Sequence, residues 1–124
     1  MPKGEWKAIK SSTTPTVLDI AWAAGVYEGE GYVNISKAGN KLKKDGSEYK
    51  RIQVSVVQKE PWLIDRLLQL FGGHKYLRIQ EAQPLYSWIC SGSRASGFLM
   101  TIYKFLSPWK QIQADAALNK WIAG

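Results

Sequence analysis

The sequence of 124 residues contains a single cysteine, Cys90, and a single histidine, His74. A disulfide framework needs paired cysteines, and a zinc finger or a histidine-based nuclease centre needs more of both residue types. No apolar run approaches the roughly 20 residues that span a bilayer, and no signal-peptide pattern is present. The sequence therefore indicates an intracellular protein without disulfides or membrane partner, in which Cys90 and His74 are structural.

Acidic residues are scarce relative to basic ones. Seventeen Lys and Arg stand against ten Asp and Glu, which gives a net charge of +7. Between residues 37 and 59 there are seven basic and two acidic residues. This balance is typical of proteins with a polyanionic partner, most often nucleic acid, although a generally basic protein has the same composition.

The hydrophobic pattern predicts one folded domain over residues 16–124, preceded by a flexible basic arm over residues 1–15. Thr16 and Asp19 have the spacing of a capping box at the start of a helix. Helical spacing and strict alternation then predict the order helix, two strands, helix, two strands, helices. The expected helices cover residues 17–29, 61–71, 94–106 and 108–122, and the expected strands cover residues 32–37, 49–57, 74–80 and 85–91.

The alternation also divides the two predicted hairpins into an apolar face and a polar face. Val33, Ile35, Ile52, Val54 and Val56 should face the helices, so the intervening polar side chains should face outward. Such side chains can read base edges, although a solvated sheet face is also polar. The candidate base readers are Asn34, Ser36, Tyr49, Arg51, Gln53, Ser55, Arg78, Gln80 and Ser87, and the candidate phosphate contacts are Lys41, Lys43 and Lys44.

The stretch "AAGVYEGEG", residues 23–31, breaks two local rules of helix formation. Gly25 and Gly29 are four residues apart, so they share one helix face that another helix can approach closely, whether from the same chain or a second one. Glu28 and Glu30 lie where a helix C-terminus concentrates negative partial charge. A hard cation such as Mg²⁺ relieves that repulsion, and an exposed turn with two solvated acids is the simpler alternative.

The same nine residues resemble the LAGLIDADG motif of homing endonucleases position for position. The resemblance continues in "VSVVQKEPWLIDRLLQLFGG" and "YSWICSGSRASGFLMTIYKFLSPWKQIQ", so it covers the chain from Val17 onward in the right order. It implies an α+β fold with an α-β-β-α-β-β-α core and a curved antiparallel sheet that binds DNA. Glutamate stands at both acidic positions where aspartate names the motif, which changes the reach of each carboxylate.

The resemblance also implies roles for individual residues. Single-motif proteins of this family are homodimers, so Ala21, Trp22, Gly25 and Gly29 are the expected dimer interface. Glu30 and the carbonyl group of Gly29 are the expected ligands of Mg²⁺ or another divalent cation such as Mn²⁺. Glu30, Gln58 and Lys110 are the expected catalytic residues, while Glu28 is similar to the family's helix-capping or interface acid.

These expectations combine into one predicted function. A ten-residue strand spans roughly 33 Å, about one turn of B-DNA, so a two-fold dimer should read a pseudo-palindrome of about 20 base pairs. We expect a site-specific, metal-dependent endonuclease that makes double-strand breaks and promotes the mobility of the intron or intein that encodes it. The alternative is a non-cleaving protein on the same fold, either an RNA-splicing maturase or a DNA-binding protein.

Overall fold

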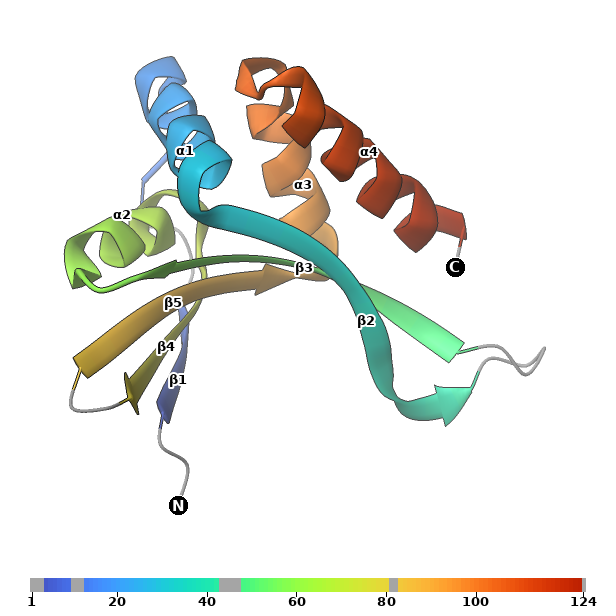
Figure 1. Cartoon of the computed structure of the whole chain (residues 1–124), viewed down its shortest axis with the longest axis horizontal. Coiled ribbons are helices and arrows are strands. Elements are labelled where there is room, and N and C mark those ends of the chain that lie inside the picture. Colours follow the sequence, from blue (N-terminus) through green and yellow to red (C-terminus); the bar gives the residue numbers. More distant parts are fainter. Residues whose placement is uncertain (1–3, 10–12, 43–47, 81–82, 124) are drawn as a thin grey trace.

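Five antiparallel strands form one sheet, and the helices cover one of its faces (Figure 1). The structure is a computed structural model that describes the backbone of residues 4–9, 13–42, 48–80 and 83–123, and the side chains of residues 13–36, 50–79 and 83–123. The elements are β1 (Gly4–Ile9), α1 (Val17–Glu30), β2 (Gly31–Leu42), β3 (Glu48–Gln58), α2 (Pro61–Phe71), β4 (Gly73–Gln80), β5 (Gln83–Ser91), α3 (Gly92–Ile102), the 3₁₀ turn η1 (Tyr103–Phe105) and α4 (Pro108–Ala123). The strand order is β1-β4-β5-β3-β2.

Helix α1 begins at the capping box that the sequence predicts. The Thr16 Oγ1 atom accepts a hydrogen bond from the Asp19 N–H at 3.2 Å, and the Asp19 carboxylate accepts one from the Thr16 N–H at 2.9 Å. These two bonds satisfy backbone donors that a helix start otherwise leaves without partners. The hydrogen bonds from Thr16 and the nearby Arg66 guanidinium lower the pKa of Asp19. The start of α1 is therefore fixed locally, before any long-range packing.

The core lies between the sheet and the helices. Ile52, Val54 and Val56 of β3 are completely buried on the helix side, as the alternation predicts, and so is Trp88 of β5. The Trp88 indole N–H donates a hydrogen bond to the Gly72 carbonyl group at 2.8 Å. Next to it, Gly73 has φ +122°, and a Cβ atom there would lie 2.9 Å from the indole nitrogen. The turn from α2 to β4 therefore requires glycine beside the largest core side chain.

The helices leave the other face of the sheet open. The sheet arches so that this open face is concave, and β2 bends along its length toward one end of the arch (Figure 1). Both termini of the described chain lie away from the start of β2, where α1 passes directly into the sheet. The fold thus presents two distinct surfaces, the concave sheet face and the outer side of α1.

Two sequence predictions differ from the structure. The flexible arm predicted for residues 1–15 contains a strand, since β1 pairs antiparallel with β4 from Gly4↔Arg78 to Ile9↔Gly73. Such pairing satisfies the backbone groups that β4 would otherwise expose at the sheet edge. The helix predicted over residues 94–106 is wrong at its end, because α3 stops at Ile102 and tightens into η1. No helix among the described residues is long and apolar enough to cross a membrane.

Candidate functional site

The motif glycine Gly31 joins α1 to β2 without a loop. Its backbone is extended, with φ −95° and ψ 160°, a conformation open to any residue. A Cβ atom at this position, however, would collide with the Tyr27 ring and lie 3.0 Å from the Tyr27 Cα atom. Glycine is therefore needed here for space and not for backbone conformation. The ring of Tyr27 occupies the volume that a side chain at Gly31 would need.

Glu28, one of the two motif glutamates, connects α1 to the start of α4. Its two carboxylate oxygens accept hydrogen bonds from the Ser107 N–H and the Ser107 hydroxyl group, both at 2.8 Å. These bonds, led by the one from the backbone, lower the pKa of Glu28, and the positive charge of Lys110 adds to the effect. A carboxylate is stabilised beside the N-terminus of a helix. Glu28 therefore caps α4, in agreement with the role that the resemblance implies.

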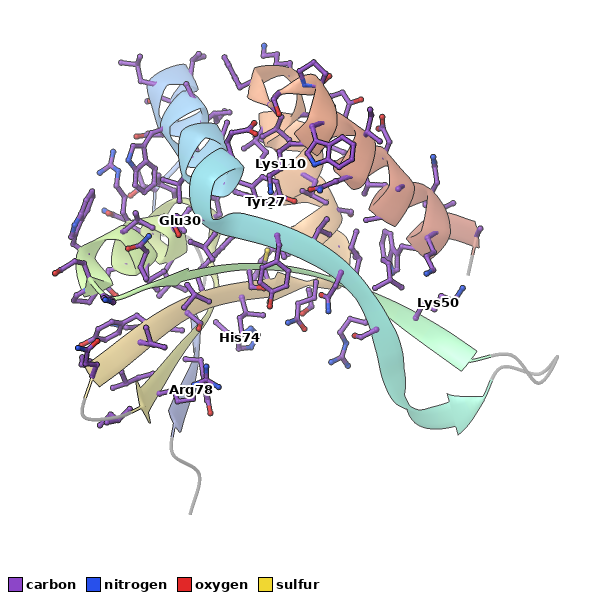
Figure 2. The ribbon with its side chains drawn as sticks, viewed as in Figure 1. Tyr27, Glu30, Lys50, His74, Arg78 and Lys110 are labelled. Carbon is purple, nitrogen blue, oxygen red and sulfur yellow. The ribbon has the colours of Figure 1, made fainter. Side chains whose placement is uncertain are left out.

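Ser107 links Glu28 to Lys110 through hydrogen bonds to both residues. Ser107 is the N-cap of α4, because its Oγ atom accepts a hydrogen bond from the Lys110 N–H at 3.3 Å. The Lys110 ammonium group donates a hydrogen bond to the Gly31 carbonyl group at 3.1 Å and lies 5.3 Å from the centre of the Tyr27 ring. Figure 2 shows Lys110 and Tyr27 beside each other between α1 and the C-terminal helices. A lysine 79 residues away from Gly31 in sequence is thus held at the motif.

The other two predicted catalytic residues flank the same junction. Glu30 is the last residue of α1, and its side chain is exposed at the sheet end of that helix (Figure 2). Gln58 is the last residue of β3 and is half-buried. Because Gly31 pairs with Val56, Gln58 lies just beyond the first paired residue of β2, next to the end of α1. The backbones of Glu30 and Gln58 therefore lie next to the Gly31 carbonyl group, to which Lys110 is hydrogen-bonded.

The donors at this junction suit a hard cation only in part. Glu30 and the Gly29 carbonyl group supply oxygen atoms, the ligand type that Mg²⁺ prefers. Among the described residues, however, no group of three or more Asp, Glu, His or Cys side chains could hold a metal ion. One chain therefore contributes one exposed carboxylate to such a site. The remaining ligands have to come from elsewhere, for example from phosphate oxygens or a second copy of the chain.

The predicted interface residues lie on or beside the outer side of α1. Gly25 and Gly29 are exposed, and a Cβ atom at either would meet nothing within 4 Å. Leu18, seven residues before Gly25, is 82% exposed. Ala21 is half-buried, and so is Trp22, whose ring lies 6.3 Å from that of Trp62 on α2. Nothing within the described chain explains two glycines in a helix interior that cost stability.

The predicted DNA-binding residues on the described strands share the open face of the sheet. The pairings Ser36↔Arg51, Asn34↔Gln53, Val57↔Ser87 and Leu85↔Arg78 place them on the side opposite Val54 and Trp88. Asn34, Arg51 and Arg78 are exposed, and Ser36, Gln53 and Ser87 are half-buried. Figure 2 shows Arg78 below the sheet, on the side away from the helices. The strand register of both hairpins therefore agrees with the sequence alternation.

Ser55 differs from this pattern. It lies on the open face, paired with Tyr32 and Ile89, but it is only 3% exposed and its hydroxyl group has no hydrogen-bond partner among the described residues. The prediction that Ser55 faces outward is therefore wrong with respect to exposure, because larger neighbours stand on both adjacent strands. The remaining candidates, Tyr49, Gln80 and Lys41 by their side chains and Lys43 and Lys44 entirely, lie outside the described residues.

Some residues at the site were not predicted from the sequence. Tyr32 is 51% exposed on the open face, where the alternation that selected Asn34 already placed it. Leu18 has the helical spacing of Gly25, which could have added it to the predicted interface. The bonds from Ser107 to Glu28 join residues 79 apart and have no local sequence signal.

Comparisons with known proteins identify the fold. No family model and no curated protein matches the sequence. Among solved structures, the homing endonuclease I-CvuI bound to DNA in the presence of Mg matches with a TM-score of 0.64 and 18% identity over 82% of this chain. The same enzyme with its target DNA and Ca matches with a TM-score of 0.63 and 19% identity over 82%. The group I intron-encoded homing endonuclease I-CeuI, complexed with DNA, matches with a TM-score of 0.61 and 18% identity over 83%.

These similar structures are LAGLIDADG homing endonucleases, so the predicted α+β fold is confirmed. The chain spans 64% of the length of the I-CvuI chains and 53% of that of I-CeuI. At this level of identity the likeness concerns the fold, and it leaves the activity to be argued from the residues themselves.

Proposed function

We propose that the protein is a site-specific double-strand DNA endonuclease of the homing type, which acts as a homodimer and depends on a divalent metal ion. The observation that carries the proposal is the hydrogen bond of Lys110 at the α1–β2 junction, where its Nζ lies 3.1 Å from the Gly31 carbonyl oxygen, next to the ends of α1 at Glu30 and of β3 at Gln58. These residues come from three separate parts of the chain. The fold's solved relatives are homing endonucleases crystallised with DNA, which supports the same substrate class for this chain.

Each residue at the junction has a distinct part in the proposed reaction. Glu30 and the Gly29 carbonyl group offer oxygen ligands to the metal ion, which can polarise a phosphate and activate water when it is bound. The Lys110 ammonium group places a fixed positive charge where negative charge builds up on the phosphate in the transition state. The Gln58 amide can both donate and accept hydrogen bonds, so it is suited to orienting a water molecule.

The outer side of α1 supports a homodimer as the active species. Small residues at Gly25 and Gly29 let two helices approach closely, and the exposed Leu18 extends this face with apolar surface. Two α1 helices side by side bring two Glu30 carboxylates near each other, and bound cations then relieve their repulsion. The second carboxylate supplies a ligand that a single chain lacks.

The concave sheet face supports duplex DNA as the substrate. Exposed Arg51, Arg78 and Asn34 can donate hydrogen bonds to base edges in a major groove, with arginine suited to guanine and asparagine to adenine. A two-fold dimer doubles this surface, so we propose a pseudo-palindromic site of about 20 base pairs. The proposed DNA face and the proposed cleavage site meet where β2 leaves α1.

A cleavage selection tests the proposal. Purified protein is incubated with a library of palindromic duplexes in Mg²⁺ or in EDTA, beside the Glu30→Gln variant, and broken ends are sequenced. We expect recurrent ends from one family of sites with wild-type protein and Mg²⁺, and none in EDTA or with the variant. Glutamine keeps the size of the side chain and removes its charge, so the variant should retain DNA binding.

Two other outcomes would favour a different function. Selective binding without cleavage in any divalent metal would contradict the nuclease and favour a DNA-binding protein on this fold. Neither binding nor cleavage of DNA, together with binding to structured RNA, would favour an RNA-splicing maturase. Comparing wild-type protein with Arg51→Ala separates specific recognition from the attraction of a basic protein to any polyanion.

A further inference from the structure

The ammonium group of Lys110, in the first turn of α4, has an aromatic neighbour on the motif helix α1. Besides its hydrogen bond to the Gly31 carbonyl group, it lies 5.3 Å from the centre of the Tyr27 ring. A cation is attracted to the negative face of an aromatic ring within about 6 Å of its centre. The fifth letter of LAGLIDADG is isoleucine, whereas this chain has tyrosine at the corresponding position.

Tyr27 itself is fixed more firmly than the lysine that it contacts. Its side chain is completely buried, and its ring meets Phe98 edge to face with 6.1 Å between ring centres. The absence of a side chain at Gly31 leaves the space that the ring occupies. The ring is therefore a rigid support whose position follows from the packing of the core and not from Lys110.

The hydroxyl group of Tyr27 does not explain why an aromatic residue stands here. It is buried and has no hydrogen-bond partner among the described residues, and its burial, with a smaller contribution from Glu28, raises the pKa of Tyr27 to about 12. A buried hydroxyl without a partner destabilises a protein. The contribution of Tyr27 to Lys110 must therefore come from the face of the ring.

We propose that Tyr27 is a positioning residue for Lys110, because its ring face holds the ammonium group beside the Gly31 carbonyl group at the α1–β2 junction. The proposal rests on the proposed function only for its consequence, which is a lysine held in place before the substrate arrives. A preorganised charge stabilises a transition state without reorganisation during the reaction. The contact itself is a property of the free protein and can be measured there.

The test compares substitutions that change the negative charge on the ring face with substitutions that change the shape of the side chain. Tyr27→Phe keeps the ring and removes the unpartnered hydroxyl group, whereas Tyr27→Leu keeps an apolar side chain without a ring. A third variant with 3,4,5-trifluorophenylalanine at position 27 keeps the volume of the ring and weakens the negative charge on its face. This last variant preserves the test if the leucine variant fails to fold.

The readout is the rate at which an amine-reactive acetylating reagent modifies Lys110 in the free protein, measured by mass spectrometry. Lys120, exposed on the same helix, is the internal reference. We expect Tyr27→Phe to label like wild type, and the leucine and trifluoro variants to label Lys110 about 3- to 10-fold faster. Equal Lys110 labelling in the phenylalanine and trifluorophenylalanine variants would overturn the proposal and leave Tyr27 as core packing only.

Cleavage kinetics distinguish the failure of this proposal from failure of the nuclease function. With a DNA site that the wild-type protein cleaves, Tyr27→Leu should slow single-turnover cleavage and leave DNA affinity unchanged. Tyr27→Phe should cleave at the wild-type rate. If wild-type protein cleaves nothing, the nuclease function fails, while the labelling series still decides whether the ring holds Lys110. Unchanged cleavage in the leucine variant, beside faster labelling, would overturn the positioning role.

Discussion

The two sides of α1 differ in what their residues contact. On the inner side, Ala23, Ala24 and Tyr27 are buried, Gly31 leaves room for the Tyr27 ring, and Glu28 is bonded to Ser107. On the outer side, Gly25 and Gly29 face open space and Leu18 is exposed. The motif thus carries glycines of two kinds: Gly31, which the folding of the single chain requires, and Gly25 and Gly29, which it does not require.

This difference separates folding from function within nine residues. A substitution on the inner side should change the stability of the single chain and, through Ser107, the position of Lys110. A residue on the outer side should leave that stability unchanged or improve it, and act on association or cleavage instead. The two motif glutamates divide in the same way, since Glu28 is held by hydrogen bonds and Glu30 is exposed.

Replacing Glu30 should give the largest effect. Metal-assisted charge stabilisation is worth several kcal/mol, so we expect Glu30→Gln to lower the single-turnover cleavage rate by about 10³-fold or more. Because Glu30 is exposed, the midpoint of thermal unfolding of the variant should stay close to that of the wild-type protein. A variant that cleaves within tenfold of wild type would remove Glu30 from the proposed metal site.

Substitutions of two motif glycines test the division directly. Gly31→Ala introduces a Cβ atom against the Tyr27 ring, and such overpacking typically lowers the free energy of unfolding by about 1–3 kcal/mol. Gly25→Ala is the matched control, because its Cβ atom meets nothing and alanine favours the helix by about 0.5–1 kcal/mol. Urea unfolding at low protein concentration measures the free energy of unfolding of both variants. Equal destabilisation by the two substitutions would contradict the division.

The pH dependence of stability gives the smallest of these effects. The pKa of Glu28 in the folded state lies below its ordinary value of 4.5, so its stabilising contribution is complete above that pH and is lost as the pH falls through the lowered pKa. Glu28→Gln should cost about 1 kcal/mol near neutral pH, the usual effect of losing a charged helix cap. The difference from wild type should shrink below pH 4.5 in urea unfolding experiments.

A matched variant separates this cap from a general effect of charge. Glu60→Gln also removes one negative charge beside a helix N-terminus, but Glu60, the N-cap residue of α2, is exposed and its side chain makes no capping hydrogen bond. Its stability difference from wild type should be small at every pH. A pH-independent loss in Glu28→Gln, or an equal pH-dependent loss in Glu60→Gln, would contradict the capping role.

The sequence predicts what depends on nearby residues. The capping box at Thr16, the buried alternation of Ile52, Val54 and Val56, and the exposed glycines on one side of α1 all follow from local spacing. Strand register also follows from alternation, so the shared face of Asn34 and Gln53 could be predicted. Glu30 and Lys110 were selected together only through the resemblance, which carries long-range information that spacing lacks.

What the sequence does not predict depends on distant neighbours. The burial of Ser55 depends on the side chains of adjacent strands, which alternation does not report. Strand β1 forms because β4 offers an unpaired edge, and its own residues carry little periodicity. The contacts of Lys110 with Gly31 and Tyr27 require α4 to fold back onto the end of α1. In each case the decisive partner lies far away in the chain.

Sedimentation equilibrium tests the central claim, that the outer side of α1 exists for a second copy of the chain. Wild-type protein and Gly25→Arg are compared from nanomolar to micromolar concentration, with folding of both confirmed by circular dichroism. We predict a two-chain species for wild type and single chains for the variant, because a long charged side chain on this face prevents close helix contact. A wild-type protein that remains a single chain throughout, with and without its DNA site, would contradict the account.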